Sequence, residues 1–278
     1  MRSFRILILS LLIPLSICYT QQDTITYDAA SGDYIIKYYP EDEYGNRKDS
    51  AVTVIFEPAT KIEAKVSCAV DFNAASKRFT YKYTLTNGLG SRQRLIDFAV
   101  EFGRNIEVAG KTLPGGWHSM RENEIEETKL TLGSMWSWHA DIGLKPGRSW
   151  QVGALESDGL PGITICYFQG KTGSSVLAFP DEGPGYNLTV KLMQLRTFPS
   201  NRVMLTTVSP VSPPTAFLAS AFVDSLISYK HQSYSLGWIT NKGILNSLDQ
   251  KLDNARKQLE RGNTKAAKNI LGAFINEV

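Results

Sequence analysis

The chain has 278 residues, with 30 Lys and Arg against 27 Asp and Glu, and a formal net charge of +3. A charge this close to balance gives no reason to expect the concentrated basic face that nucleic-acid binding requires. Hydrophobic residues make up 42% of the chain and charged residues 21%, a balance that is ordinary for a globular protein and excludes a disordered one.

The first twenty residues have the pattern of a cleavable secretory signal. Arg2 and Arg5 form a positive start, Ile6 to Ile13 is an apolar run, and smaller, more polar residues follow. This run is far shorter than the roughly 20 apolar residues that span a bilayer, and no later stretch supplies them. We therefore expect a signal peptide over 1–20 and a secreted, periplasmic or cell-surface product of charge +1, since two arginines are lost. Acylation of Cys18 as a lipoprotein anchor is one alternative, and a buried N-terminal helix is another.

From about residue 24 to 208 the hydrophobic pattern has a period of two. Residues 79–85 alternate Phe, Tyr, Tyr and Leu with polar residues, and residues 96–102 repeat the alternation. The turn residues Asn87-Gly88 interrupt the pattern between the two runs. This pattern predicts an antiparallel pair with one buried face. Further strands are predicted at Tyr34–Tyr39, Val52–Phe56, Lys65–Phe72, Trp136–Asp141, Trp150–Leu155, Ile163–Phe168, Val176–Phe179, Leu188–Leu195 and Val203–Val208. Turn residues separate them and no helical segment intervenes, so we predict a mainly β fold, an antiparallel β-sandwich or flattened barrel over 21–208.

The pattern changes after residue 208. Three prolines within Pro210–Pro214 exclude a central strand or a helix interior, which predicts a Pro-rich linker over 209–215. Beyond it the apolar spacing is helical, first over about 217–229 and then as a stripe from Leu245 to Leu259 at spacings of three and four. Gly262 follows where that helix should stop, and Asn263 or Thr264 can cap the next one. We expect a small α-helical hairpin or bundle over 216–278.

The C-terminal part, from about residue 225 to 278, resembles the FIMAH module, a small helical family of secreted bacterial proteins. The matching segments are 248–255 (LDQKLDNA), 258–259 (QL), 261–267 (RGNTKAA) and 273–278 (AFINEV). The resemblance covers about a fifth of the chain and implies packing and capping roles, with no catalytic residues to carry over. Family members usually continue into a further helix, so the module is expected to be incomplete at Val278.

The β region resembles, more weakly, sandwich segments of uncharacterised secreted bacterial proteins. The shared features are a tryptophan, a Pro-Gly-x-Ser segment and a Leu-Pro-Gly segment, here Trp136 with Trp138, 146–149 and 160–162. This resemblance implies export and a sandwich fold, and it implies no reaction.

Two cysteines remain after the signal peptide is removed. Cys68 and Cys166 would lie in an oxidising compartment, where such a pair tends to form a disulfide. Closing a loop of about 100 residues contributes on the order of 4 kcal/mol when the geometry allows it. Two separately buried thiols are the alternative, because both cysteines lie in apolar runs.

Four tryptophans fall close together and form the first candidate binding site. Extracellular sandwiches often bind sugars by stacking rings on exposed indoles, and residues two apart on a strand share a face. Core packing of the rings is the alternative interpretation. The candidate binding residues are Trp117, Trp136, Trp138 and Trp150.

The chemistry that enzymes need is sparsely represented. His118, His139 and Asp141 are metal-ligand types, but a catalytic metal needs at least three convergent ligands, and the remaining histidine, His231, lies beyond the linker. The acidic cluster Glu122 to Glu127 is more typical of a solvated loop than of a calcium or acid–base site. No nucleophile turn or phosphate-binding loop is present.

The sequence therefore favours a secreted non-catalytic binding or surface-associated module without a cofactor or metal. Its expected partner is an extracellular glycan or a cell-surface protein. A glycan or ester hydrolase with a site near His118, His139 and Asp141 is the first alternative, and a structural envelope or matrix component is the second.

Overall fold

The computed structural model describes residues 22–102, 108–111, 117–120, 123–125, 130–138, 143–172, 183–196, 200–213, 216 and 218–278. For 108–138 it describes the backbone alone. The predicted signal peptide and the strand predicted at Val176–Phe179 lie outside these residues, so both stay predictions. The chain forms two compact units, Met1–Pro58 with Gly173–Arg196, and Ala59–Thr172 with Thr197–Val278. This differs from the single β domain predicted over 21–208.

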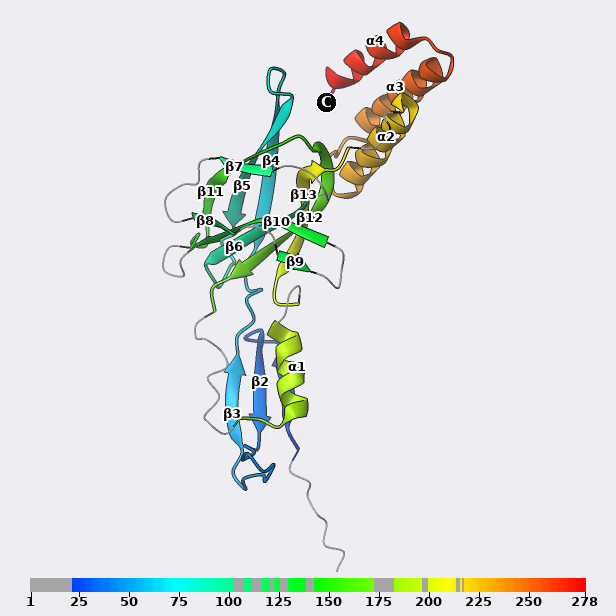
Figure 1. Cartoon of the computed structure of the whole chain (residues 1–278). Helices are drawn as coiled ribbons and strands as arrows, with labels where there is room; N and C mark the ends of the chain where they lie inside the picture. Colours follow the sequence, from blue (N-terminus) through cyan, green and yellow to red (C-terminus); the bar gives the residue numbers. More distant parts are fainter. Residues whose placement is uncertain are drawn as a thin grey trace, which may run out of the picture. The chain divides into compact units, whose positions relative to one another are not determined.

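The first unit is a three-stranded antiparallel sheet with one helix packed on it (Figure 1). The strands are β1 (Thr24–Asp28), β2 (Asp33–Tyr38) and β3 (Val52–Phe56), in that order across the sheet. Alternate residues of β2 are buried, as a sheet covered on one face requires. The helix α1 (Tyr186–Arg196) covers that face. The buried cluster between sheet and helix consists of Ile36, Tyr38, Phe56, Leu188 and Leu192.

The strand predicted at Leu188–Leu195 is wrong, because this segment is α1. Leu188, Leu192 and Leu195 are four and three residues apart, so they form one helical stripe that packs against the sheet. The first part of the same segment also alternates apolar and polar residues. A run this short fits both the period of two of a strand and the period of about 3.6 of a helix.

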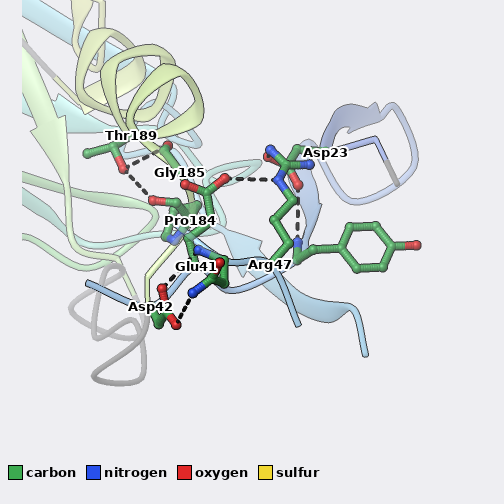
Figure 2. Close-up of polar contacts among 9 residues, drawn as sticks. Asp23, Glu41, Asp42, Arg47, Pro184, Gly185 and Thr189 are labelled. Atoms are coloured by element: carbon green, nitrogen blue, oxygen red, sulfur yellow. Dashed lines mark hydrogen bonds and ion pairs between the residues drawn. The ribbon is translucent and has the colours of Figure 1, made fainter. Parts of the chain in front are cut away.

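A polar network ties the turn after β2 to the start of α1 (Figure 2). The Arg47 guanidinium donates to Glu41 Oε1 at 2.9 Å and to Asp23 Oδ2 at 3.1 Å. A Cβ on Gly185 would lie 2.4 Å from Glu41 Oε1, so this carboxylate reaches the residue that precedes the helix. The Thr189 hydroxyl closes the first helical turn by donating to the carbonyl of Pro184 at 3.1 Å. These contacts are structural, since they satisfy the loop and the helix end internally.

The second unit contains two antiparallel sheets (Figure 1). One has the order β4 (Ala64–Asn73), β5 (Arg78–Asn87), β11 (Arg148–Ser157) and β7 (Val108–Lys111). The other has the order β13 (Val203–Val211), β12 (Leu160–Gly170), β6 (Leu95–Phe102), β10 (Leu130–Trp138) and β8 (Trp117–Met120). A short strand, β9 (Asn123–Ile125), pairs with β10 beside β8.

One hydrophobic core lies between these two sheets, which is the arrangement of a β-sandwich. Tyr81, Tyr83 and Leu85 of β5 share it with Phe98 of β6 and Phe168 of β12, and all five are fully buried. The rings of Tyr83 and Phe98 meet edge to face, with centroids 5.4 Å apart. The alternation predicted for 79–85 therefore does place its apolar residues in the core.

The predicted pairing of 79–85 with 96–102 is wrong, because β5 and β6 belong to different sheets. The side-chain amide of Asn87 is fully buried and donates to the carbonyls of Gln93 and Leu144, each at 2.9 Å. These bonds stabilise the connection between β5 and β6 in a conformation that passes from one sheet to the other, where a hairpin turn would keep both strands in one sheet.

The predicted linker over 209–215 begins later, because β13 continues to Val211 and pairs Pro210 with Pro161. Among the described strands β13 is at the edge of its sheet. An edge strand has one side without a ladder, so it accommodates a proline that lacks an N–H.

Three helices follow, namely α2 (Ala219–Ser235), α3 (Lys242–Glu260) and α4 (Thr264–Ile275). The leucine stripe of α3 is buried at Leu245, Leu248 and Leu252, and its Asn241 N-cap accepts from the N–H of Gly243 at 2.8 Å. Lys251 of α3 pairs with Glu277, which lies just beyond α4, so α3 and α4 run antiparallel. No helix in the described part of the chain has the length and apolar character to cross a bilayer.

Candidate functional site

The predicted tryptophan and histidine residues fall largely on strands whose side chains are not described. In the backbone register, Trp136 of β10 is opposite Phe98 and Ser119, and Trp138 is opposite Trp117. His118 of β8 is opposite Ser137. His139 and Asp141 lie outside the described residues. The aromatic platform and the histidine site therefore stay predictions.

Trp150 is the one predicted binding residue with a described side chain. It lies on β11 opposite Leu85 and is 43% exposed. Within the acidic cluster, Glu124 is opposite Thr131, whereas Glu122, Glu126 and Glu127 are outside the described residues. The described residues contain no group of three or more His, Cys, Asp or Glu side chains able to hold a metal ion.

The candidate disulfide is not formed, since Cys68 and Cys166 are both free thiols. Cys166 is fully buried in the sandwich core, and its Sγ contacts the carbonyl of Leu205 at 3.5 Å. Burial raises the pKa of the Cys68 thiol to about 12 and that of Cys166 further still. Tyr83 of β5 is opposite Cys68; burial raises the pKa of its phenol well above the ordinary value, and the nearby Cys68 and Cys166 thiols raise it further. The interpretation of two separate thiols is the one that the structure supports.

An apolar cavity in the second unit lies between α2 and the ends of β12 and β13. We call it the α2 pocket. Its volume is about 260 Å³. Its lining is Leu160, Pro161, Val211, Ser212, Ala216, Leu218, Ala221, Phe222, Ser225 and Tyr229. Most of these side chains are apolar, and the hydroxyls of Ser212, Ser225 and Tyr229 are the hydrogen-bonding side-chain groups of the lining.

Gly162 explains how this pocket forms. A Cβ at this position would lie 2.5 Å from one methyl carbon of Val211 and 3.1 Å from the Tyr229 hydroxyl. No side chain fits there, so the glycine lets α2 approach the antiparallel pair of β12 and β13. The Leu-Pro-Gly segment singled out in the sequence thus supplies two lining residues and the contact point for the helix.

A second, more open depression lies further along α2, and we call it the His231 depression. Its volume is about 480 Å³, and its lining is Ile163, Thr206, Ser228, His231, Gln232, Ser235 and Leu236. The lining side chains come from α2 or the residue after it and from β12 and β13. The two hollows therefore follow the same helix along the same strand pair.

Behind this depression a charge cluster joins α2 to α3. Lys230 is only 4% exposed and pairs with the carboxylate of Asp249, whose Oδ1 lies 3.4 Å from His231 Nε2. Desolvation lowers the pKa of Lys230, and the nearby Asp253 carboxylate acts in the opposite direction. A buried ammonium needs such partners, so the cluster fixes how α2 sits on α3.

Comparison with known proteins adds little to this geometry. No protein-family model and no curated protein matches the chain. A crystal structure of an uncharacterized protein from Nocardia farcinica, described as having an immunoglobulin-like fold, is 8% identical with a TM-score of 0.31. The match covers 53% of this chain and 98% of that chain. The FIMAH resemblance of the C-terminal part stays a prediction.

Proposed function

We propose that this protein is an exported, non-catalytic binding protein that holds an apolar side chain of a polypeptide partner in the α2 pocket. The observation that carries the proposal is the pocket itself, with its apolar lining and a volume of about 260 Å³. A cavity of about 150 Å³ is enough to bind benzene, whereas sites for whole small molecules usually measure about 300–1,000 Å³. The size therefore suits one large side chain better than a complete metabolite.

The rim of the pocket supports a polypeptide ligand. Ser212, Ser225 and Tyr229 each place a hydroxyl among the apolar lining residues. Ser225 donates to the carbonyl of Ala221 at 3.1 Å, and its oxygen keeps capacity to accept a hydrogen bond. A few polar groups around an apolar hollow can pair with the backbone amides on either side of an inserted side chain.

Nuclear magnetic resonance with capped amino acids tests this proposal. We expect N-acetyl-tryptophanamide and N-acetyl-leucinamide to shift amide signals of α2 and of the β12–β13 strand pair, and N-acetyl-alaninamide to leave them unchanged. Ala221→Trp should abolish the shifts, because Ala221 lines the pocket and is itself exposed, so a larger side chain fills the hollow without disturbing the core. Ala273→Trp, at an exposed position of α4 away from the pocket, is the matched control.

The same titration separates the alternatives. An N-acetylglucosamine oligomer that shifts signals around Trp150, while the capped amino acids shift none, would favour carbohydrate binding and contradict the polypeptide proposal. The hydrolase and structural-component hypotheses stay predictions, since the residues named for the hydrolase site lie where side chains are not described.

A further inference from the structure

The helical part carries a second apolar hollow, which we call the α4 groove. It lies between α2 and α4 and has a volume of about 370 Å³. Its apolar lining is Ala219, Phe222, Val223, Leu259, Ala267, Leu271, Gly272 and Ile275, and Thr264 and Lys268 complete it. This volume is more than twice the cavity of about 150 Å³ that accommodates benzene. The groove thus has room for two apolar side chains, as the i and i+3 or i+4 anchors of a docked helix require.

Gly272 in the groove is not explained by the fold. It lies inside α4, where glycine costs about 1 kcal/mol relative to alanine. A Cβ built at this position meets no atom within 4 Å, so packing does not require a glycine here. A helical glycine on an apolar groove instead permits close approach by the backbone of another helix.

The charges around the groove indicate which kind of helix would fit. Between Asn254 and Asn276 the sequence has five basic residues, Arg256, Lys257, Arg261, Lys265 and Lys268, against the single acid Glu260. Arg256 is paired with Asp224 and Asp253. Among the described residues, no carboxylate pairs with Arg261, Lys265 or Lys268, and Lys268 lines the groove. An incoming helix with acidic residues beside its apolar stripe would complement these charges.

We propose that the α4 groove is a docking site for an amphipathic helix of another protein, with apolar anchors seated over Gly272 and carboxylates along the border next to Lys265 and Lys268. The side chain of Ile275, at 70% exposure, also lines the groove and would be covered by the same helix. This surface is distinct from the α2 pocket, with which it shares only Phe222.

Fluorescence anisotropy with two designed peptides tests the proposal on the full mature chain. Each peptide is an amphipathic helix of about three heptads with leucine at the core positions, flanked by glutamate in one peptide and lysine in the other. We expect the glutamate peptide to bind at least about tenfold more tightly than the lysine peptide, with affinity that falls as salt is raised. Lys268→Glu should reduce or reverse that preference.

Gly272→Leu should weaken the glutamate peptide by at least about tenfold, because the side chain enters the open space of the groove. Ala273→Leu, at the neighbouring exposed position of α4, is the matched control and should bind as the native chain does. Circular dichroism of both variants checks that the helices remain folded. Equal binding of the two peptides, or unchanged binding by Gly272→Leu, would overturn the proposal.

Sedimentation velocity tests the other occupant, a second copy of this chain. If the native chain dimerises and Gly272→Leu is monomeric, the groove is a self-association surface and the proposed acidic partner is wrong. Because Gly272 does not line the α2 pocket, the capped amino acids of the first experiment should still shift their signals in this variant. The two proposals can therefore fail separately.

Discussion

Alkaline pH should unfold the sandwich, because its core holds two phenols and a thiol that have no access to water. Tyr81, Tyr83 and Cys166 are each fully buried. Tyr83 donates its hydroxyl to the carbonyl of Val208 at 2.9 Å, and Tyr81 donates to that of Gly159 at 2.8 Å. Desolvation raises the pKa of all three groups well above their ordinary values. The stability that these groups contribute is therefore fully present below their unfolded pKa values and is lost as pH rises toward the folded ones.

The size of this loss follows from the ordinary pKa values, which are 9.0 for the Cys166 thiol and 10.0 for Tyr81 and Tyr83. Each pH unit above these values costs about 1.4 kcal/mol per group in the free energy of unfolding. At about pH 11 the three groups together cost roughly 5.5 kcal/mol, and the slope there is about 4 kcal/mol per pH unit. Since domains are stable by about 5–15 kcal/mol, we expect unfolding within one or two units above about pH 10.

Urea denaturation followed by circular dichroism between about pH 8 and about pH 11 measures this slope. Tyrosinate absorbance in the ultraviolet should appear together with unfolding for the buried rings. Tyr83→Phe removes one titrating group, so its slope above about pH 10 should be shallower by about 1.4 kcal/mol per pH unit, although the variant is less stable at neutral pH. Tyr44→Phe, at a ring that is 80% exposed, is the control. A free energy of unfolding that is unchanged at about pH 11, or an unaltered slope in Tyr83→Phe, would refute this reasoning.

Three smaller predictions concern the helices and the thiols. Gly272→Ala should stabilise the second unit by up to about 1 kcal/mol and raise its Tm by about 2–4 °C, because the Cβ meets no atom within 4 Å; a lower Tm would contradict this. Asp249→Asn should cost about 1–3 kcal/mol in urea denaturation, because it removes the carboxylate partner of the buried Lys230, and adding Lys230→Met should recover part of that loss. Under non-reducing conditions mass spectrometry should find Cys68 and Cys166 unlinked, with Cys166 alkylated only after denaturant is added; a linked pair would restore the disulfide hypothesis.

Hydrophobic periodicity predicted most elements correctly where it was strong. The alternation of residues 79–85 corresponds to the buried face of β5, and the stripe from Leu245 to Leu259 corresponds to α3. Both patterns depend on local spacing alone, which a single sequence displays directly. The segment at Leu188–Leu195 was predicted wrongly because its apolar spacing fits both a strand and a helix. Its helical form is favoured by packing against the separate sheet of the first unit, which the local spacing does not reveal.

Which strands pair could not be predicted from spacing. The runs 79–85 and 96–102 are neighbours in the sequence and have similar patterns, yet they face each other across the core from two sheets. The buried Asn87 contributes to this arrangement, because its amide donates to the carbonyls of Gln93 and Leu144, which belong to two other segments of the chain. Pro210 posed a related difficulty, because a proline is tolerated in a strand only when that strand is at an edge.

The candidate site escaped sequence reasoning for a similar reason. Exposed indoles and histidines stand out by residue type, whereas the α2 pocket arises where apolar residues of α2 and of two strands far apart in the sequence, β12 and β13, leave space between them. The one local signal was Leu160-Pro161-Gly162, a segment whose glycine has a Cβ position blocked by Val211. A glycine in a strand indicates a close approach by another backbone or side chain, but not which element approaches.

Phe222 provides a test of how the two proposed surfaces are connected, because it is the residue that lines both the α2 pocket and the α4 groove. Neighbouring residues of α2 have divided roles, since Ala221 lines only the pocket and the fully buried Val223 lines only the groove. Phe222→Ala should therefore weaken both the capped amino acids and the glutamate peptide, whereas Ala221→Trp should affect only the former and Gly272→Leu only the latter. If Phe222→Ala remains folded by circular dichroism and leaves either ligand unaffected, the wall shared by the two hollows does not contribute to that ligand, and the surface in question must be redrawn without it.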